Sequence, residues 1–331
     1  MKALVYKKPG RISFTDIDMP KLRNNEVLIK TAFSGICGTD IHIMAQDSPA
    51  ANGIILGHEF SGHVAQCGGD ISEFKINDKV VVDPNNFCGK CAFCRKGQVH
   101  FCENLKPIGI FKNGGWAEYC AVPENQVHKL PENASLKSAA LTEPLSCIIH
   151  GWNRCQSVSP DSSILILGAG LIGLLWGILL RHFGYKNLTI SEIATQRKET
   201  AIHLGFDTRN FPDIEASHEK FDLIIDCTGN PAAVEKAFQW INPLGKFLFF
   251  GVCPQNSRIS INPYQIFRQE LTIIGSVINP FTFRSTIDLL SSIEIPLEQL
   301  GIGLFPLNKY DEAISTIRNG LISKALFDLS L

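Results

Sequence analysis

The segment at residues 164–180, ILILGAGLIGLLWGILL, decides the fold. It opens with the apolar run Ile164–Leu167 and continues into G-x-G-x-x-G, with glycines at 168, 170 and 173. Such glycines allow a tight turn and a close approach of pyrophosphate to a helix N-terminus, where free N–H groups meet the positive end of the helix dipole. The segment therefore predicts a strand, a phosphate-binding turn and a helix that runs toward His182 and stops at Gly184.

A membrane span is the alternative for this uncharged run. Its length lies at the lower end of the roughly 17 to 25 residues that a span requires. Four glycines, at 168, 170, 173 and 177, interrupt it. We therefore favour the strand, turn and helix.

The flanking sequence predicts two kinds of architecture. After about residue 162, apolar runs alternate with helix-length segments, which predicts βαβ units and a parallel sheet buried on both faces. The expected strands are Ile164–Leu167, Leu188–Ser191, Asp222–Asp226, Lys246–Phe250 and Leu271–Val277. Residues 1–150 instead contain short β-rich runs punctuated by Gly and Pro. These runs are Val27–Thr31, Gly62–Ala65 and Lys79–Val82, and apolar residues from Tyr310 to Leu321 then repeat at helical spacing behind a cap at Asn308.

Composition bounds the class of protein. The 331 residues suggest two domains, and 45% apolar with 19% charged residues excludes disorder as the main state. A net charge of -1 gives no general attraction to nucleic acid or anionic lipid. The N-terminus lacks the features of a secretory signal, so we expect a cytoplasmic protein, in which eleven cysteines indicate thiols and metal ligands rather than disulfides.

The predicted parallel sheet carries a dinucleotide-binding pattern. Glu192 ends the second strand nineteen residues after Gly173, where a carboxylate accepts from the adenosine ribose and repels the extra phosphate of NADP. We therefore predict NAD over NADP, although Arg197 either lies along the adenine, offsets a 2′-phosphate or is simply an exposed helix residue. The expected cofactor-binding residues are Gly168, Gly170, Leu171, Ile172, Gly173, Glu192, Arg197, and, at later strand ends, Thr228 and Val252.

Four cysteines, Cys88, Cys91, Cys94 and Cys102, fall within one short loop. Tetrahedral thiolate coordination suits Zn²⁺, and four sulfurs leave no position for a substrate, so the site is expected to be structural. Chance clustering and an iron–sulfur cluster are alternatives, although the spacing lacks the Cys-Pro ending of bacterial ferredoxins. Neighbouring basic residues are compatible with a nucleic-acid zinc knuckle or with simple offset of thiolate charge, and the rest of the chain favours the latter.

A second candidate metal site is open. Cys37 and His58 come from separate turns, and Glu143 completes three protein ligands while leaving a fourth position for water or substrate. That vacancy is what a catalytic zinc requires.

These motifs together resemble the medium-chain alcohol dehydrogenases. The similarity rests on Gly57-His58-Glu59 with Gly62 and Gly68, on Cys37-Gly-Thr-Asp-Ile-His, on the four-cysteine lobe, on Glu143-Pro-Leu and on the glycine motif, in the family's order along nearly the whole chain. It is nearest to the sorbitol, threonine and butanediol dehydrogenase branch. The resemblance implies an α/β protein: a GroES-like β-barrel catalytic domain, residues 1–147 and 285–331, around a Rossmann domain with a doubly wound parallel sheet, residues 148–284.

The resemblance also implies roles for individual residues. Cys37 and His58 would bind the catalytic zinc with either Glu59 or Glu143, the other carboxylate lying nearby, and Cys147 is a fallback ligand. Thr39 and His42 match the family's proton-relay positions.

The implied activity is hydride transfer between a polyol, or a related secondary alcohol, and NAD, with two zinc ions per chain. Ile278-Asn279-Pro280-Phe281 replaces the arginine–aromatic pair of sorbitol dehydrogenases, which argues against sorbitol itself. The alternatives are a zinc-organised, non-catalytic binding protein and a quinone or enal reductase. The exposed edge predicted at 271–277 suggests a homodimer or homotetramer.

Overall fold

The computed structural model describes residues 1–331 and divides into two compact units. The first unit comprises residues 1–146, 279–294 and 302–331, and the second comprises residues 147–278 and 295–301. The chain therefore returns to the first unit at residue 279, earlier than the boundary near 285 that the sequence suggested. We describe each unit by itself.

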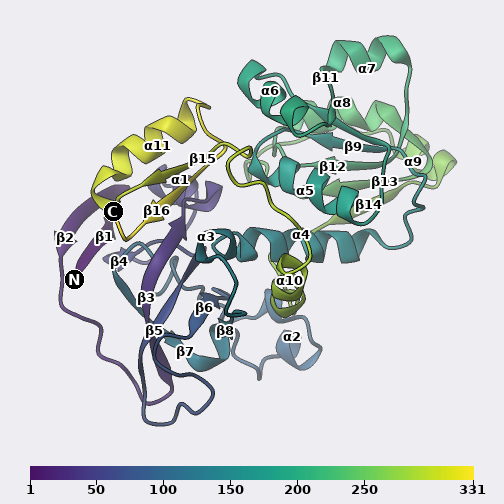
Figure 1. The fold of residues 1–331 in the computed structure, drawn as a ribbon. Helices are drawn as coiled ribbons and strands as arrows, with labels where there is room; N and C mark the ends of the chain where they lie inside the picture. The colour runs from purple at the N-terminus through teal and green to yellow at the C-terminus, as the bar shows by residue number, and fades with distance from the viewer. The chain divides into compact units, whose positions relative to one another are not determined.

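The second unit is built on a six-stranded sheet in which every pairing is parallel (Figure 1). The strand order β11-β10-β9-β12-β13-β14 places the first strand of the unit at its centre, the arrangement typical of dinucleotide-binding sheets. The central strands are buried along their whole length, which requires covering helices on both faces. The strands are β9 (Ile164–Leu167), β10 (Leu188–Ser191), β11 (Asp207–Arg209), β12 (Phe221–Asp226), β13 (Ile241–Phe249) and β14 (Thr272–Gly275).

Side chains cap several of the helices that connect these strands. Asn210, Asn230 and Asn262 each accept hydrogen bonds from backbone N–H groups in the first turn of their helix, and proline occupies an early position in all three helices. The helices are α5 (Leu171–His182), α6 (Thr195–His203), α7 (Phe211–Ser217), α8 (Pro231–Ala237) and α9 (Pro263–Gln269), with the 3-10 turn η3 (Phe238–Trp240). Helix α5 ends at His182, as predicted.

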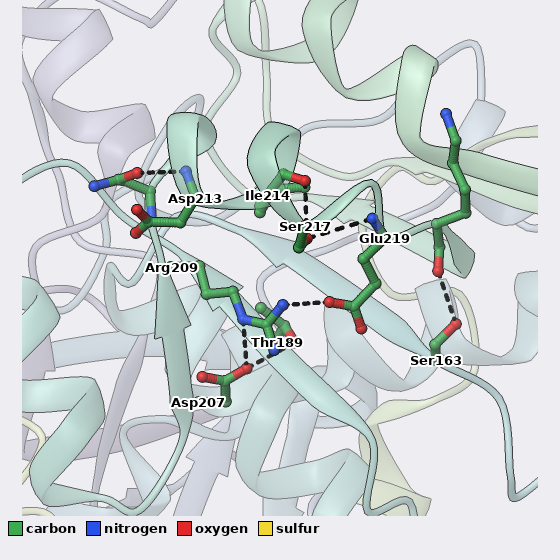
Figure 2. Close-up of polar contacts among 10 residues, drawn as sticks. Ser163, Thr189, Asp207, Arg209, Asp213, Ile214, Ser217 and Glu219 are labelled. Carbon is green, nitrogen blue, oxygen red and sulfur yellow. Dashed lines mark hydrogen bonds and ion pairs between the residues drawn. The ribbon is translucent and has the colours of Figure 1, made fainter.

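Ion pairs hold the edge strand β11 (Figure 2). Arg209 contacts Asp207 at 2.9 Å and also pairs with Glu219, and the hydroxyl of Thr189 donates to Asp207. These contacts connect β10, β11 and the segment that follows α7. They fasten an edge that only one neighbouring strand supports.

The first unit contains two sheets. One has the order β15-β16-β3-β5-β6-β8, with β7 also paired to β3, and the smaller one has the order β2-β1-β4. The strands are β1 (Lys2–Lys7), β2 (Arg11–Asp16), β3 (Glu26–Gly35), β4 (Ile54–Ile55), β5 (Phe60–Cys67), β6 (Lys79–Val82), β7 (Tyr119–Pro123), β8 (Val127–Lys129), β15 (Ile302–Phe305) and β16 (Lys324–Asp328).

Short helices connect the strands of the first unit. They are α1 (Gly38–Met44), α2 (Ala92–Arg95), α3 (Leu136–Ala139), α10 (Phe283–Leu290) and α11 (Tyr310–Arg318), with the 3-10 turns η1 (Val99–Phe101), η2 (Glu124–Gln126) and η4 (Leu307–Lys309). Helix α4 (Thr142–Cys155) begins in the first unit and continues into the second.

The predicted cap of α11 was wrong. Lys309, not Asn308, occupies the N-cap position, and no side chain caps the helix there. Leu307–Lys309 form the turn η4 that leads directly into the helix, so the chain needs no separate capping residue.

The glycine-rich run forms a strand, a turn and a short helix rather than a span. No helix of the structure is both long enough and apolar enough to cross a membrane.

Candidate functional site

Cys37, His58 and Glu59 form a compact set in the first unit. Their ligand atoms, one sulfur, one nitrogen and one oxygen, all lie within 4.8 Å of one another. Cys37 follows β3 and occupies the N-cap position of α1, whereas His58 and Glu59 come directly before β5. Strands β3 and β5 pair with each other, so the sheet brings these two chain turns together.

The surroundings of His58 favour a positive charge at this set. Its Nδ1 lies 3.6 Å from Oδ1 of Asp40, and both residues are buried. Burial alone would lower the pKa of His58, but the charges of Asp40 and Cys37 outweigh it and raise that pKa well above the usual value. Neither of these two atoms has a hydrogen-bond partner, and a carboxylate behind one ring nitrogen is the arrangement that orients a metal-binding histidine. The donor set and its surroundings therefore fit a zinc ion with an open position.

Lys324 forms an ion pair with Glu59 inside the same core. Lys324 is 5% exposed and Glu59 1% exposed. Burial would lower the pKa of Lys324, but Glu59, Cys37 and Asp40 raise it. Gly35 leaves the room for this pair, because a Cβ at that position would lie 2.1 Å from Oε2 of Glu59.

The predicted relay residues lie on α1. The Cys37 thiol donates to Oγ1 of Thr39 at 3.7 Å, and Thr39 is half-buried. His42 is exposed, with Nδ1 3.8 Å from Oδ2 of Asp47. Glu143, the other predicted carboxylate, is buried in the first turn of α4, where Cys147 also lies.

The four-cysteine lobe assembles as a second set. The sulfurs of Cys88, Cys91, Cys94 and Cys102 all lie within 4.8 Å of one another. Backbone N–H groups donate to these sulfurs: Cys88 N to Cys102 at 3.3 Å and Cys91 N to Cys88 at 3.4 Å. The N–H groups of Lys90 and Cys91 lower the pKa of the Cys88 thiol to about 6. The loop thus stabilises thiolates, the form in which cysteine binds zinc.

A pocket of about 810 Å³ opens at the glycine loop of the second unit. Gly168, Gly170, Glu192, Arg197 and Thr228 are among the residues that line it. Gly168 has a φ of +96°, and a Cβ at Gly173 would lie 1.9 Å from the carbonyl oxygen of Gly168, so both positions require glycine. Leu171 and Ile172 form the first turn of α5, whose free N–H groups suit a pyrophosphate.

The other predicted cofactor residues differ in their surroundings. The hydroxyl of Thr228 donates to Asp226 at 2.6 Å, which aims the methyl group at Gly168. Nε of Arg197 is buried without a hydrogen-bond partner. Val252 is 80% exposed and is not among the residues that line this pocket.

Sequence reasoning missed two residues beside the metal-binding set, Asp40 and Lys324. Asp40 is three residues after Cys37 and closes a capping box with it, a spacing that the sequence does contain. Lys324 had a weaker signal: it is a charged residue at the start of the otherwise apolar strand KALFD. Nothing local connects it to Glu59, because the two strands lie at opposite ends of the chain.

Comparisons with known proteins match both units. A family model described as alcohol dehydrogenase GroES-like domain matches residues 23–132, and one described as zinc-binding dehydrogenase matches residues 172–292. The D-altritol 5-dehydrogenase of Agrobacterium fabrum is 35% identical over 83% of this chain and 84% of its own length. The D-arabinitol dehydrogenase 1 of Uromyces fabae is 30% identical over 95% of this chain and 93% of its own. A solved zinc-binding dehydrogenase of Sinorhizobium meliloti, bound to NADP, has 30% identity and a TM-score of 0.92, covering 99% of this chain and 98% of that one.

Proposed function

Because the chain belongs to the zinc-binding medium-chain alcohol dehydrogenase family, it is an oxidoreductase acting on CH–OH donors, and we propose how its residues divide that work. The observation that carries the proposal is the Cys37, His58 and Glu59 set. One sulfur, one nitrogen and one oxygen from separate turns leave a zinc ion open to a substrate. A quinone or enal reductase without catalytic zinc has no use for such a set.

We assign the catalytic zinc to Cys37, His58 and Glu59, and the structural zinc to the four cysteines of the lobe. A zinc ion held at the first set supplies Lewis-acid chemistry to an alcohol oxygen, and the bound NAD accepts the hydride. Asp40 orients the imidazole, and Lys324 offsets the charge of the carboxylate. Glu143 is the nearby second carboxylate of this proposal.

Thr39 and His42 form the proposed route for the substrate proton. Thr39 lies beside the Cys37 sulfur, and His42, one helical turn further along α1, is exposed to solvent. A hydroxyl next to the reacting oxygen and an imidazole at the surface are the two ends that a proton relay needs.

The dinucleotide is proposed to bind at the pocket of the second unit, with its pyrophosphate at residues 170–172. Glu192 places a carboxylate in this pocket, which supports NAD over NADP. The solved relative from Sinorhizobium meliloti was bound to NADP, so both cofactors belong in the assay.

A polyol is the proposed substrate, given the altritol and arabinitol dehydrogenases among the relatives. The test is a panel of pentitols, hexitols and simple secondary alcohols with NAD or NADP, with and without a zinc chelator. We expect chelator-sensitive oxidation of a polyol with NAD, and two zinc ions per chain. A protein with one zinc ion and no polyol-dependent reduction of NAD would overturn the proposal in favour of a non-catalytic binding protein.

We also propose that the enzyme assembles as a homodimer or homotetramer through the edge strand β14. Thr272, Ile273 and Gly275 of this strand are exposed, and Phe267 of α9 is 77% exposed. An open edge with exposed apolar side chains suits pairing with a second copy. Eleven free cysteines support a reducing compartment such as the cytoplasm.

A further inference from the structure

The carboxylate of Glu192 is fully engaged by the protein's own backbone. Oε2 accepts from the N–H of Ala169 at 2.9 Å, and Oε1 accepts from the N–H groups of Ile193 at 2.8 Å and Ala194 at 2.9 Å. Glu192 is 8% exposed and Ala169 is completely buried. An acidic residue that served only to receive ribose hydroxyls would not need three backbone donors.

These three donors belong to the starts of two helices. Ala169 precedes Gly170, the N-cap of α5, and Ala194 is the N-cap of α6. Neither N-cap residue makes a side-chain capping hydrogen bond. One carboxylate, near the positive ends of both helices, replaces the two missing caps.

The position of the carboxylate gives it control of the pocket's dimensions. Gly168 and Gly170 form the pyrophosphate side of the pocket, and Ile193 and Ala194 form the side for the adenosine ribose. Glu192 joins these two sides, and the hydrogen bond from Gly168 N to the carbonyl oxygen of Ser191, at 2.7 Å, is a second link beside it. Without the carboxylate, three backbone N–H groups lose their acceptor and the glycine loop loses its tie to the turn.

We propose that Glu192 is a positioning residue that sets the spacing between the pyrophosphate cradle and the ribose site, and so controls affinity for every dinucleotide. The inference rests on the proposed dinucleotide site and extends it. Its consequence concerns cofactor preference: removing this carboxylate, the obvious route to admitting NADP, weakens NADP as well as NAD.

The first test uses the zinc-loaded, nucleotide-free protein labelled with ¹⁵N-alanine. Amide hydrogen exchange at Ala169 and Ala194 is compared in wild type, Glu192→Gln and the control Asp222→Asn. Asp222 also accepts a backbone N–H, from Ser163 at 2.8 Å, but it is not among the pocket's lining residues. We expect about tenfold faster exchange or more at both alanines in E192Q only, with Ala201 inside α6 unchanged. Exchange at wild-type rates in E192Q would overturn the proposal.

The second test separates positioning from ribose contact. Equilibrium binding of ADP and of 2′,3′-dideoxy-ADP, which lacks the ribose hydroxyls, is measured for wild type and E192Q. A positioning role weakens both nucleotides by the same factor, about tenfold, whereas a simple ribose contact weakens ADP and leaves the dideoxy analogue unchanged. In addition, Glu192→Ala should bind NADP less tightly than wild type does, and tighter NADP binding would contradict the proposal. If wild type binds no nucleotide, the proposed cofactor site fails, and the exchange experiment still tests Glu192.

Discussion

At the scale of single residues, the buried pair of Lys324 and Glu59 makes the largest electrostatic commitment beside the metal-binding set. Replacing one partner leaves a buried charge without compensation, which typically costs about 3 to 5 kcal/mol. We therefore expect Lys324→Met to lower the free energy of unfolding of the metal-free protein by an amount in that range. Urea denaturation measures it.

The matched control for this variant is Lys309→Met. Lys309 pairs with Glu312 at 3.5 Å, but both side chains are well exposed, and such pairs contribute about 0 to 1 kcal/mol. Equal losses of stability in K324M and K309M would show that burial of the Glu59 pair has no special weight.

Asp83 gives the stability a defined dependence on pH. Burial raises its pKa to about 6 from 3.8, so ionisation costs more in the folded than in the unfolded state. The associated stability is fully present below about pH 4 and is lost as the pH rises through about 6. The loss is on the order of 3 kcal/mol at pH 7.

The variant Asp83→Asn tests this dependence. Its amide oxygen still accepts the N–H of Asn85, which lies 3.0 Å from Oδ1, but the side chain no longer ionises. We expect the stability of D83N relative to wild type to increase between pH 4 and pH 7, as measured by urea denaturation. Asp70→Asn removes one exposed charge as the control, and a D83N profile parallel to wild type would contradict the assignment.

At the scale of elements, the four-cysteine lobe is one continuous loop between β6 and β7, with α2 and η1 inside it. Because its four sulfurs depend on one another, the loss of one opens the shell. We expect Cys94→Ser to bind one zinc ion per chain instead of two, as measured by elemental analysis. Cys253→Ser, outside both metal-binding sets, should retain two, and two zinc ions in C94S would contradict the assignment of the lobe.

The elements were predictable where the signal is local. The strands Lys79–Val82, Ile164–Leu167 and Leu188–Ser191 have the predicted bounds, because apolar runs end at glycine or polar residues there. Strand β1 shows the limit of this reasoning. Its residues alternate like those of a half-exposed strand, yet Ala3 to Tyr6 are all buried, because they belong to a core that also contains Trp116, Ile314 and Phe327.

The same distinction applies to the site. The glycine loop and the cysteine lobe carry their patterns in neighbouring residues, so the sequence predicts them directly. The pair of Glu59 and Lys324 depends on strands β5 and β16, which join only through β3. The three donors of Glu192 are backbone groups, and no residue type reveals them.

At the scale of the whole molecule, the exposed edge β14 predicts the state of assembly. A lysine on an edge strand prevents pairing between copies. We expect Ile273→Lys to shift the protein from dimer or tetramer toward monomer in sedimentation experiments, while Ile202→Lys leaves the assembly unchanged. Ile202, on α6, is an equally apolar residue and is 52% exposed. A monomeric wild type, or an I273K variant that assembles like wild type, would contradict the proposed interface.

The positions of the two metal-binding sets along the chain also determine when each can mature during translation. All four cysteines of the lobe emerge from the ribosome together, within residues 88–102, so that loop can close on its ion while synthesis continues. Glu59 emerges earlier still, but Lys324 is among the last residues made. Until β16 joins β3, the nascent chain holds a carboxylate with no countercharge, so the open metal site reaches its final form only after release.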